Sequence, residues 1–127
     1  DMMKELVQTT GMGADPFIKM RENMHRGVSW WRPELTSQED LNDIAAATQA
    51  VFEYCVVNLA AWTKIHTGCK HLALAGGGAL NRDAIDLLRD KWDTVHVPQN
   101  PGDPGSCIGA VLAKTKTKVI LDKQWHR

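Results

Sequence analysis

Three consecutive glycines, Gly76, Gly77 and Gly78, are the feature of this sequence best suited to chemistry. They follow the apolar segment "LALA" and precede a helix-compatible segment that contains Asn81. Glycines let a ligand approach the main chain without meeting a side chain, and a helix N-terminus offers N–H groups to phosphate. Asn81 adds both a donor and an acceptor. The pattern predicts an anion or nucleotide site, with a tight, closely packed strand-to-helix turn as the alternative.

A second loop, "PQNPGDPGS", places Asp103 between Gly102 and Gly105. It also follows an expected strand and leads into an expected helix. In an open parallel sheet, loops at the carboxyl ends of strands line one crevice, so we expect both loops to face the same cleft. A lone carboxylate in that cleft could bind a metal ion or act as a general base. The alternative is that Asp103 only shapes a Pro-Gly turn or caps the helix.

Alternating strand and helix patterns in the second half of the chain predict an α/β fold with a right-handed crossover. The expected elements are a strand at "HLALA", an amphipathic helix at "LNRDAIDLLRDKW", a strand at "TVHV", a helix at "SCIGAVLAK" and a last strand at "KVILD". In the first of these helices the inward residues should be Leu80, Ala84, Leu87 and Leu88.

A long helix is expected before this α/β segment. Ser37 with Asp40 three residues later resembles a capping box, and the helix should run to about His66 and stop at Gly68. Apolar residues recur at the period of one helix face: Leu41, Ile44, Ala45, Phe52, Cys55, Val56 and Leu59.

The first third of the chain is less regular. It predicts a short helix within residues 1–10 and a second from Asp15 to Gly27, opened by Pro16 at its first position. The segment "VSWWRPEL" should be extended, because Pro33 disfavours the helical conformation in the residue before it. We therefore separate an N-terminal helical and extended segment, residues 1–36, from a lobe at 37–127, within a single domain overall.

Composition sets outer limits on function. The 127 residues are 43% hydrophobic and 24% charged, with 15 basic and 15 acidic side chains, typical of a globular domain. This balance gives no attraction to nucleic acid or to anionic membranes. No apolar run is expected to span a bilayer. The segment "DMMKELVQTT" lacks the apolar region of a secretory signal peptide. Three cysteines form no closed disulfide framework, so we expect a reducing, cytoplasmic setting.

Other reactive side chains have simpler explanations. His66, Cys69 and His71 lie within six residues and could hold zinc, but no second cluster completes four ligands. Cys107 lies near a helix start, where a thiol pKa can fall; a small packing residue is expected because no base is close in sequence. Of Trp30 and Trp31, one is expected in the core and the other over its edge, unless they stack on a sugar or a partner.

The segments "DIAAATQAVFE", "TGCKHLALAGG", "GGGALN" and "VPQNPGDPGSCIGAVL" resemble, in order and spacing, motifs of the O-carbamoyltransferases of nodulation-factor and antibiotic biosynthesis. The resemblance runs from Asp40 to Leu112. It implies part of an actin-like ATPase (ribonuclease H-like) catalytic domain, which has two lobes around a nucleotide cleft. This chain resembles the C-terminal lobe. Gly78 and Pro104 depart from the family pattern, which has Val and Ala there.

The resemblance also implies an activity. Carbamoyl phosphate and ATP give a carbamoyl-adenylate, and the carbamoyl group passes to a hydroxyl-bearing small molecule. By the same resemblance, Gly76, Gly77, Gly78 and Asn81 bind the nucleotide, and Asp103 helps hold a divalent metal ion, of Fe or Mg/Mn type, beside the phosphates.

The family's metal-binding histidines have no counterpart here, because no H-x-x-x-H spacing occurs. We therefore assign no catalytic residue to the chain. We expect it to require a missing N-terminal lobe or a partner chain, and an exposed half-cleft would make a homo-oligomer unsurprising. Two alternatives are a non-catalytic interaction or assembly module of the same superfold and an unrelated doubly wound nucleotide-binding domain.

Overall fold

The computed structural model describes residues 7–9, 18–21 and 26–118. The chain forms two compact units, Asp1–Gly68 and Cys69–Arg127. Every residue of the expected nucleotide site lies in the second unit.

The first unit contains a two-stranded antiparallel sheet. Strand β1 (Val7–Thr9) pairs with β2 (Ile18–Met20), with Val7 opposite Met20. Two short helices were expected here, and for the described residues that expectation is wrong. The physical reason is that β-branched residues such as Val7 and Ile18 lose little freedom in a strand. The rest of those two expected helices, residues 1–6, 10–17 and 22–25, lies outside the described residues.

A single helical turn replaces the extended segment expected after Gly27. Helix α2 (Val28–Trp31) begins after Gly27, whose φ is 83°. It ends at Arg32, whose φ of −141° and ψ of 75° are not helical. The constraint from Pro33 is therefore present, but it acts only on the residue before the proline and leaves Val28–Trp31 free to form a turn.

The long helix α3 (Gln38–Thr67) confirms the expected element at both ends. The Asp40 N–H donates to the Ser37 hydroxyl oxygen over 3.1 Å, and the Ser37 N–H donates to the Asp40 carboxylate over 3.3 Å. This capping box satisfies two main-chain donors that the helix itself cannot. At the other end, Gly68 adopts a φ of 66° and its N–H bonds the Lys64 carbonyl oxygen.

The core of the first unit is small. Val7 and Val51 are buried, and Trp31 and Cys55 pack against them. Trp30 is 49% exposed, with the Arg26 guanidinium 4.8 Å from its ring centroid. The two tryptophans thus divide as expected, one against the core and one outside it.

The expected apolar face of α3 is only partly right. Its buried residues are Ile44, Val51 and Ala60, whereas Leu41 and Leu59 are 40% and 51% exposed. Within the described part of the chain, packing covers the middle of this face more completely than its ends.

By length and composition alone, α3 could cross a membrane, since one 18-residue window has a mean hydropathy of 1.4. The expectation that no apolar run spans a bilayer stays a prediction, because length and composition alone do not test it. The core helix of a soluble protein passes the same test, so this property does not indicate where the protein resides.

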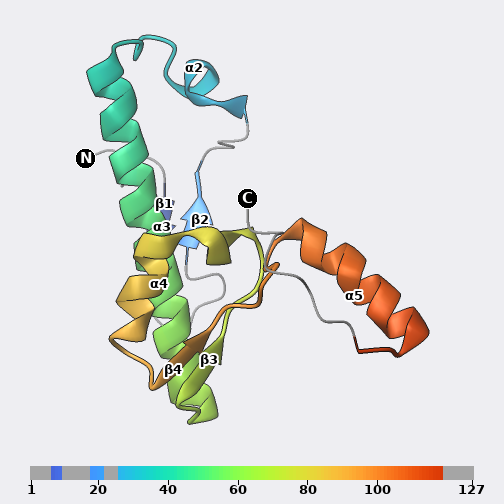
Figure 1. Cartoon of the computed structure of the whole chain (residues 1–127). Helices are drawn as coiled ribbons and strands as arrows, with labels where there is room; N and C mark the ends of the chain where they lie inside the picture. Colours follow the sequence, from blue (N-terminus) through green and yellow to red (C-terminus); the bar gives the residue numbers. More distant parts are fainter. Residues whose placement is uncertain (1–6, 10–17, 22–25, 119–127) are drawn as a thin grey trace. The chain divides into compact units, whose positions relative to one another are not determined.

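The second unit has the expected α/β character (Figure 1). Strand β3 (His71–Ala73) pairs in parallel with β4 (Thr94–His96), with His71 opposite Thr94. The His71 Nδ1 and Thr94 hydroxyl form a 2.8 Å hydrogen bond across the strands. Helix α4 (Arg82–Arg89) connects the strands and packs against β4. The last expected strand, "KVILD", lies outside the described residues from position 119 onward.

Buried residues in the connecting segment differ from the expected set. Ala84 and Leu88 are buried as expected, but Leu80 is 66% exposed and Leu87 is 39% exposed. Leu80 belongs to a separate 3₁₀ turn, η2 (Gly77–Leu80), so the period of α4 does not govern its direction. The other buried residues of this segment are Ala79, Ile85 and Trp92.

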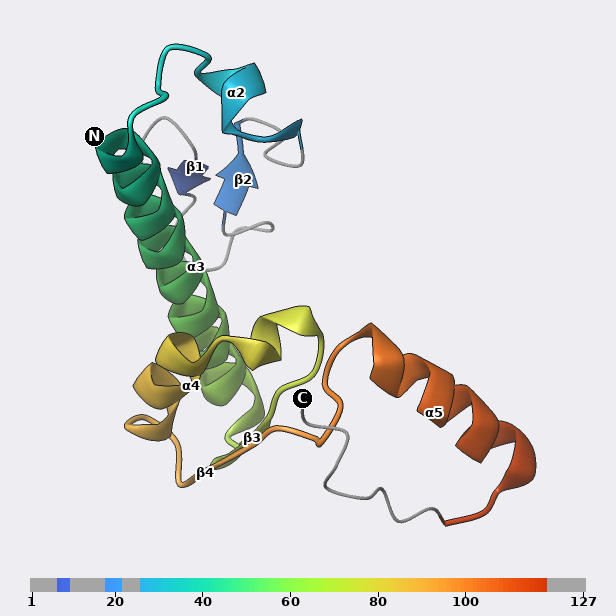
Figure 2. The same ribbon diagram turned by 45° about the horizontal axis from the view of Figure 1, so that its top comes forward.

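Helix α5 (Asp103–Thr115) follows β4 and starts earlier than expected, inside the segment predicted as a turn. Figures 1 and 2 both show it leading away from β3 and β4. In the described part of the chain none of its 13 residues is buried. An apolar helix without a buried residue is unusual, since such helices normally lie in a core.

Candidate nucleotide site

The glycine turn begins where β3 ends. Gly76 has φ 94° and ψ 167°, a main-chain conformation that is essentially restricted to glycine. The turn is then closed by two hydrogen bonds of 3.1 Å, from the Ala79 N–H to the Gly76 carbonyl and from the Asn81 N–H to the Gly78 carbonyl. The N–H groups of Gly77 and Gly78, at the start of η2, are not needed for this closure.

Space is available on the outer side of the turn. A Cβ atom built on Gly76 or Gly77 would meet no atom of the described residues within 4 Å. The main-chain conformation explains the glycine at position 76, but neither conformation nor packing within the described residues requires one at position 77. A side chain at Gly77 would instead occupy this open space.

Asn81 has a structural role that the sequence analysis did not anticipate. It lies at the N-cap of α4, and its side-chain oxygen accepts a 3.1 Å hydrogen bond from the Ala84 N–H. Asparagine is among the best N-cap residues because it satisfies a donor at the helix start. The side-chain oxygen of Asn81 is therefore used to cap α4.

Asp103 occupies the first turn of α5. The N-cap residue is Gly102, which offers no side chain to cap the helix, and Pro104 follows at a position that proline favours. The Gly105 N–H donates to the Gly102 carbonyl over 2.9 Å. The Asp103 side chain is exposed, and a carboxylate at a helix N-terminus is favourably placed with respect to the helix dipole.

The two loops adjoin one another. The Gly76 N–H donates a 2.6 Å hydrogen bond to the Pro101 carbonyl oxygen, and the Leu74 N–H donates to the His96 carbonyl over 2.9 Å. A Cβ on Gly102 would lie 3.9 Å from the Gly77 Cα. Figure 1 shows the segment after β3 running beside the segment after β4. The two glycine loops thus lie at the same end of the sheet; the cleft that they are expected to share stays a prediction.

Metal ligands are scarce in this part of the molecule. The described residues contain no group of three or more His, Cys, Asp or Glu side chains arranged to hold a metal. His66 instead bonds the Trp62 carbonyl oxygen through Nδ1 over 2.8 Å, and His71 bonds Thr94. The described residues therefore do not make a metal site, and Asp103 could supply only one ligand of one.

Two residues of the second loop were missed by the sequence analysis. Pro101 contributes through its carbonyl oxygen, which no side-chain pattern reveals. Asn100 has a buried side-chain Nδ2 without a hydrogen-bond partner among the described residues, and its carbonyl group lies against Gly105. The only sequence signal for this close approach was the glycine at position 105.

A family model described as carbamoyltransferase N-terminus matches residues 20–112 of this chain. This is most of the sequence, and it includes β3, the glycine turn, β4 and most of α5. The chain belongs to the carbamoyltransferase N-terminus family. The resemblance described above is thereby confirmed at the level of the family. The matched model describes an N-terminus; the assignment to the C-terminal lobe of a catalytic domain remains a prediction.

A curated relative of this carbamoyltransferase-family chain is an uncharacterized protein of Synechocystis sp.. The two are 39% identical over 83 residues, which is 64% of this chain and 14% of the relative. The chain thus spans about one seventh of the length of the curated relative that it matches. No solved structure matches the chain.

Proposed function

We propose that this chain supplies the nucleotide-binding part of a carbamoyltransferase. In the reaction, water first releases phosphate from carbamoyl phosphate and leaves carbamate. An oxygen of the carbamate then attacks the α-phosphate of ATP, which forms the carbamoyl-adenylate and releases pyrophosphate. The hydroxyl oxygen of a small-molecule acceptor then takes the carbamoyl group, and AMP leaves. The observation that carries the proposal is the junction of the two glycine loops, Gly76 with Pro101, in a member of the carbamoyltransferase family.

The glycine turn is suited to phosphate. Its outer side is open at Gly77, and the N–H groups at the start of η2 are polarised toward an anion. The uncapped N-terminus of α5 lies beside it, because Gly102 adjoins Gly77. Two helix starts therefore meet at one place, and both favour negative charge. In this proposal the turn binds and orients the phosphates of ATP.

Asp103 is proposed as one ligand of a divalent cation that accompanies the nucleotide. It is exposed and lies in the first turn of α5, next to the loop junction. Hard cations such as Mg²⁺ take oxygen ligands and usually share them with substrate phosphates. The remaining protein ligands would come from outside the described residues, so we assign no catalytic step to this cation.

The chain is proposed to act with a complementary lobe, as in an actin-like ATPase domain. Helix α5 has only Asp103 and Lys114 as charged side chains, yet it has no buried residue in the described part of the chain. The curated relative is about seven times as long as the matched segment. We therefore expect little or no carbamoyl transfer by this chain alone, and turnover only when the complementary lobe is added.

Calorimetric titration of the purified chain with ATP, AMP and carbamoyl phosphate tests this proposal. We expect ATP to bind, and to bind more tightly with Mg²⁺. Asp103→Asn should remove the Mg²⁺ effect. Asp83→Asn is the matched control, because Asp83 is an exposed carboxylate in the first turn of α4 and should leave the effect intact. A well-folded chain that binds no ATP at millimolar concentration would contradict the proposal.

An assembly module is the second candidate, and the exposure of α5 is the observation that favours it. Val111 is 58% exposed near the middle of this helix. On this alternative the chain self-associates through α5 and binds no nucleotide. Sedimentation equilibrium should then show a dimer that Val111→Lys returns to monomer, while calorimetry shows no heat with ATP.

A further inference from the structure

Gly105 lies where the first turn of α5 meets the loop that precedes it. A Cβ atom at this position would overlap the Asn100 carbonyl oxygen and lie 3.2 Å from the Asn100 carbonyl carbon. Both are main-chain atoms, so they cannot swing aside as the end of a side chain can. Any residue other than glycine at position 105 therefore forces a main-chain shift, at Asn100 or in the first turn of α5.

A displacement at Asn100 would reach the glycine turn through one residue. Pro101 follows Asn100, and its ring fixes φ, so the proline cannot absorb the movement by rotating about that bond. The Pro101 carbonyl oxygen accepts the 2.6 Å hydrogen bond from the Gly76 N–H. The Gly105 N–H is itself held by the Gly102 carbonyl over 2.9 Å. Contacts thus run without a break from Gly105 to Gly76.

We propose that Gly105 is a positioning residue for the nucleotide site. By allowing Asn100 to lie against α5, it holds the Pro101 carbonyl where the Gly76 N–H can reach it, and so sets the glycine turn. Gly105 acts only through these groups and touches no ligand. The effect on nucleotide binding rests on the proposed function, whereas the effect on the Gly76 hydrogen bond does not.

Gly109 provides a matched control within the same helix. A Cβ on Gly109 would meet nothing within 4 Å, so Gly109→Ala adds a methyl group without a clash. Both Gly105→Ala and Gly109→Ala replace glycine by alanine within α5, and both gain helix propensity. A difference between the two variants therefore reports the contact with Asn100.

Amide hydrogen exchange followed by NMR tests the proposal on the full chain. In Gly105→Ala, the Gly76 amide should lose protection by about tenfold or more, as expected when a local hydrogen bond opens. The Ile85 amide, which bonds the Asn81 carbonyl in α4, should keep its protection, whereas general destabilisation would affect both amides. Gly109→Ala should leave both unchanged. Equal protection of Gly76 in Gly105→Ala and Gly109→Ala would overturn the proposal.

If Gly105→Ala does not fold, amide hydrogen exchange in the unmodified protein tests the positioning role instead. The proposal requires the Gly76 and Gly105 amides to open in one event, with the same opening free energy and the same dependence on denaturant. Separate openings would overturn it.

Titration with ATP extends the test to the ligand. The affinity of Gly105→Ala should fall by about tenfold relative to Gly109→Ala. If no variant binds ATP but the Gly76 amide still responds to Gly105→Ala, the positioning role stands and the nucleotide function fails. If ATP binds and both variants behave alike in exchange and titration, the nucleotide function stands and the positioning role fails.

Discussion

The Gly76 N–H donates a hydrogen bond of 2.6 Å to the Pro101 carbonyl oxygen. This contact ties the loop after β3 to the loop after β4, beyond the last paired residues of the two strands. It brings the glycine turn and the Asp103 loop to one end of a parallel pair, where ligands bind in open α/β sheets.

Gly76→Ala should destabilise the second unit by about 1–3 kcal/mol, because its φ of 94° and ψ of 167° are strained for any residue with a Cβ. Gly77→Ala is the matched control, since position 77 has open space and no positive φ. Urea denaturation followed by circular dichroism measures both. Equal free energies of unfolding for the two variants would show that the main-chain conformation at position 76 does not require glycine.

The same Gly77→Ala variant should lower the affinity for ATP while the protein remains folded. Its methyl group would occupy the open side of the turn, where the proposal places a phosphate, and binding should fall by about tenfold or more. Calorimetric titration of folded protein measures the effect. Unchanged affinity would show that the ligand does not approach this side of the turn.

Asn81→Ala should cost about 1 kcal/mol of stability, because the side chain caps α4 through the Ala84 N–H. Asn81→Asp should keep the cap, since aspartate is an equally good N-cap residue. If Asn81 also lies against the nucleotide, the added negative charge should weaken ATP binding in Asn81→Asp without loss of stability. Equal ATP binding by the unmodified protein and Asn81→Asp would limit Asn81 to its structural role.

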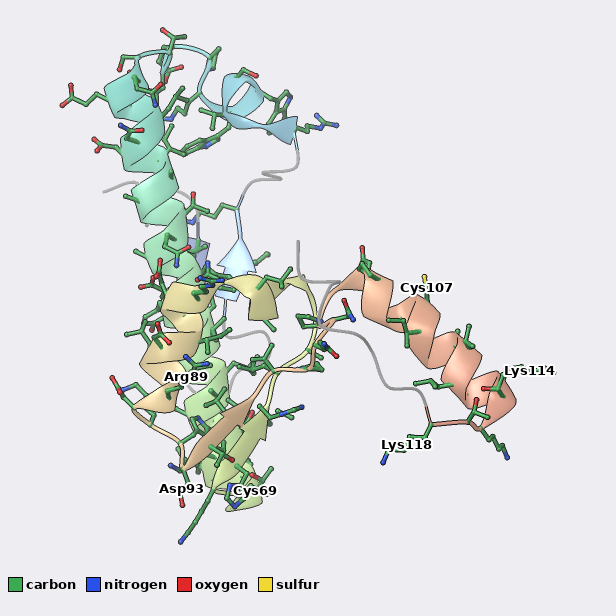
Figure 3. All side chains as sticks on the ribbon, viewed as in Figure 1. Cys69, Arg89, Asp93, Cys107, Lys114 and Lys118 are labelled. Carbon is green, nitrogen blue, oxygen red and sulfur yellow. The ribbon has the colours of Figure 1, made fainter. Side chains whose placement is uncertain are left out.

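The three cysteines should differ in reactivity. Cys69 and Cys107 are exposed, and Figure 3 shows the Cys107 sulfur pointing outward from α5. Cys55 packs beside Val51, and burial raises the pKa of its thiol, with a smaller opposing effect from a main-chain hydrogen bond. Iodoacetamide at pH 7.5 should therefore modify Cys69 and Cys107 first, as mass spectrometry can follow. Early modification of Cys55 in folded protein would contradict this placement.

The same raised pKa predicts a dependence of stability on pH. The folded state holds the Cys55 proton more tightly than the unfolded chain does, so its contribution is complete below the unfolded-state pKa of about 8.5. The contribution is lost as the pH rises through the folded-state pKa. Cys55→Ser, compared with the unmodified protein in urea denaturation between pH 7 and 10, should show a smaller alkaline loss of stability. If Cys55→Ser and the unmodified protein lose the same stability at alkaline pH, the loss comes from titratable groups other than Cys55.

The sequence predicted the fold best where neighbouring residues alone determine where a helix begins or ends. The capping box at Ser37 and the glycine at Gly68 gave both ends of α3, because each acts on a few neighbouring main-chain groups. Strand β1 was missed because a three-residue strand carries almost no period of its own.

The sequence predicted that the two glycine loops adjoin, but not the contacts that join them. Alternating strands and helices placed both glycine loops at one end of the sheet, as the structure confirms. The Pro101 carbonyl could not be foreseen, since every residue has a carbonyl group and the sequence does not say which of them is approached. The donor and acceptor of Asn81 favour a ligand contact, but asparagine before a helix is also an N-cap signal, and the structure shows the N-cap.

Strands β3 and β4 have only three residues each, and among the described residues they pair only with each other. Within the described residues, each strand keeps one edge whose N–H and C=O groups can pair with a further strand. Such edges are templates for joining chains, and they promote aggregation when left uncovered. Protein concentration is consequently a variable to control in every measurement above, and a complementary lobe that adds a strand would also improve the solubility of this chain.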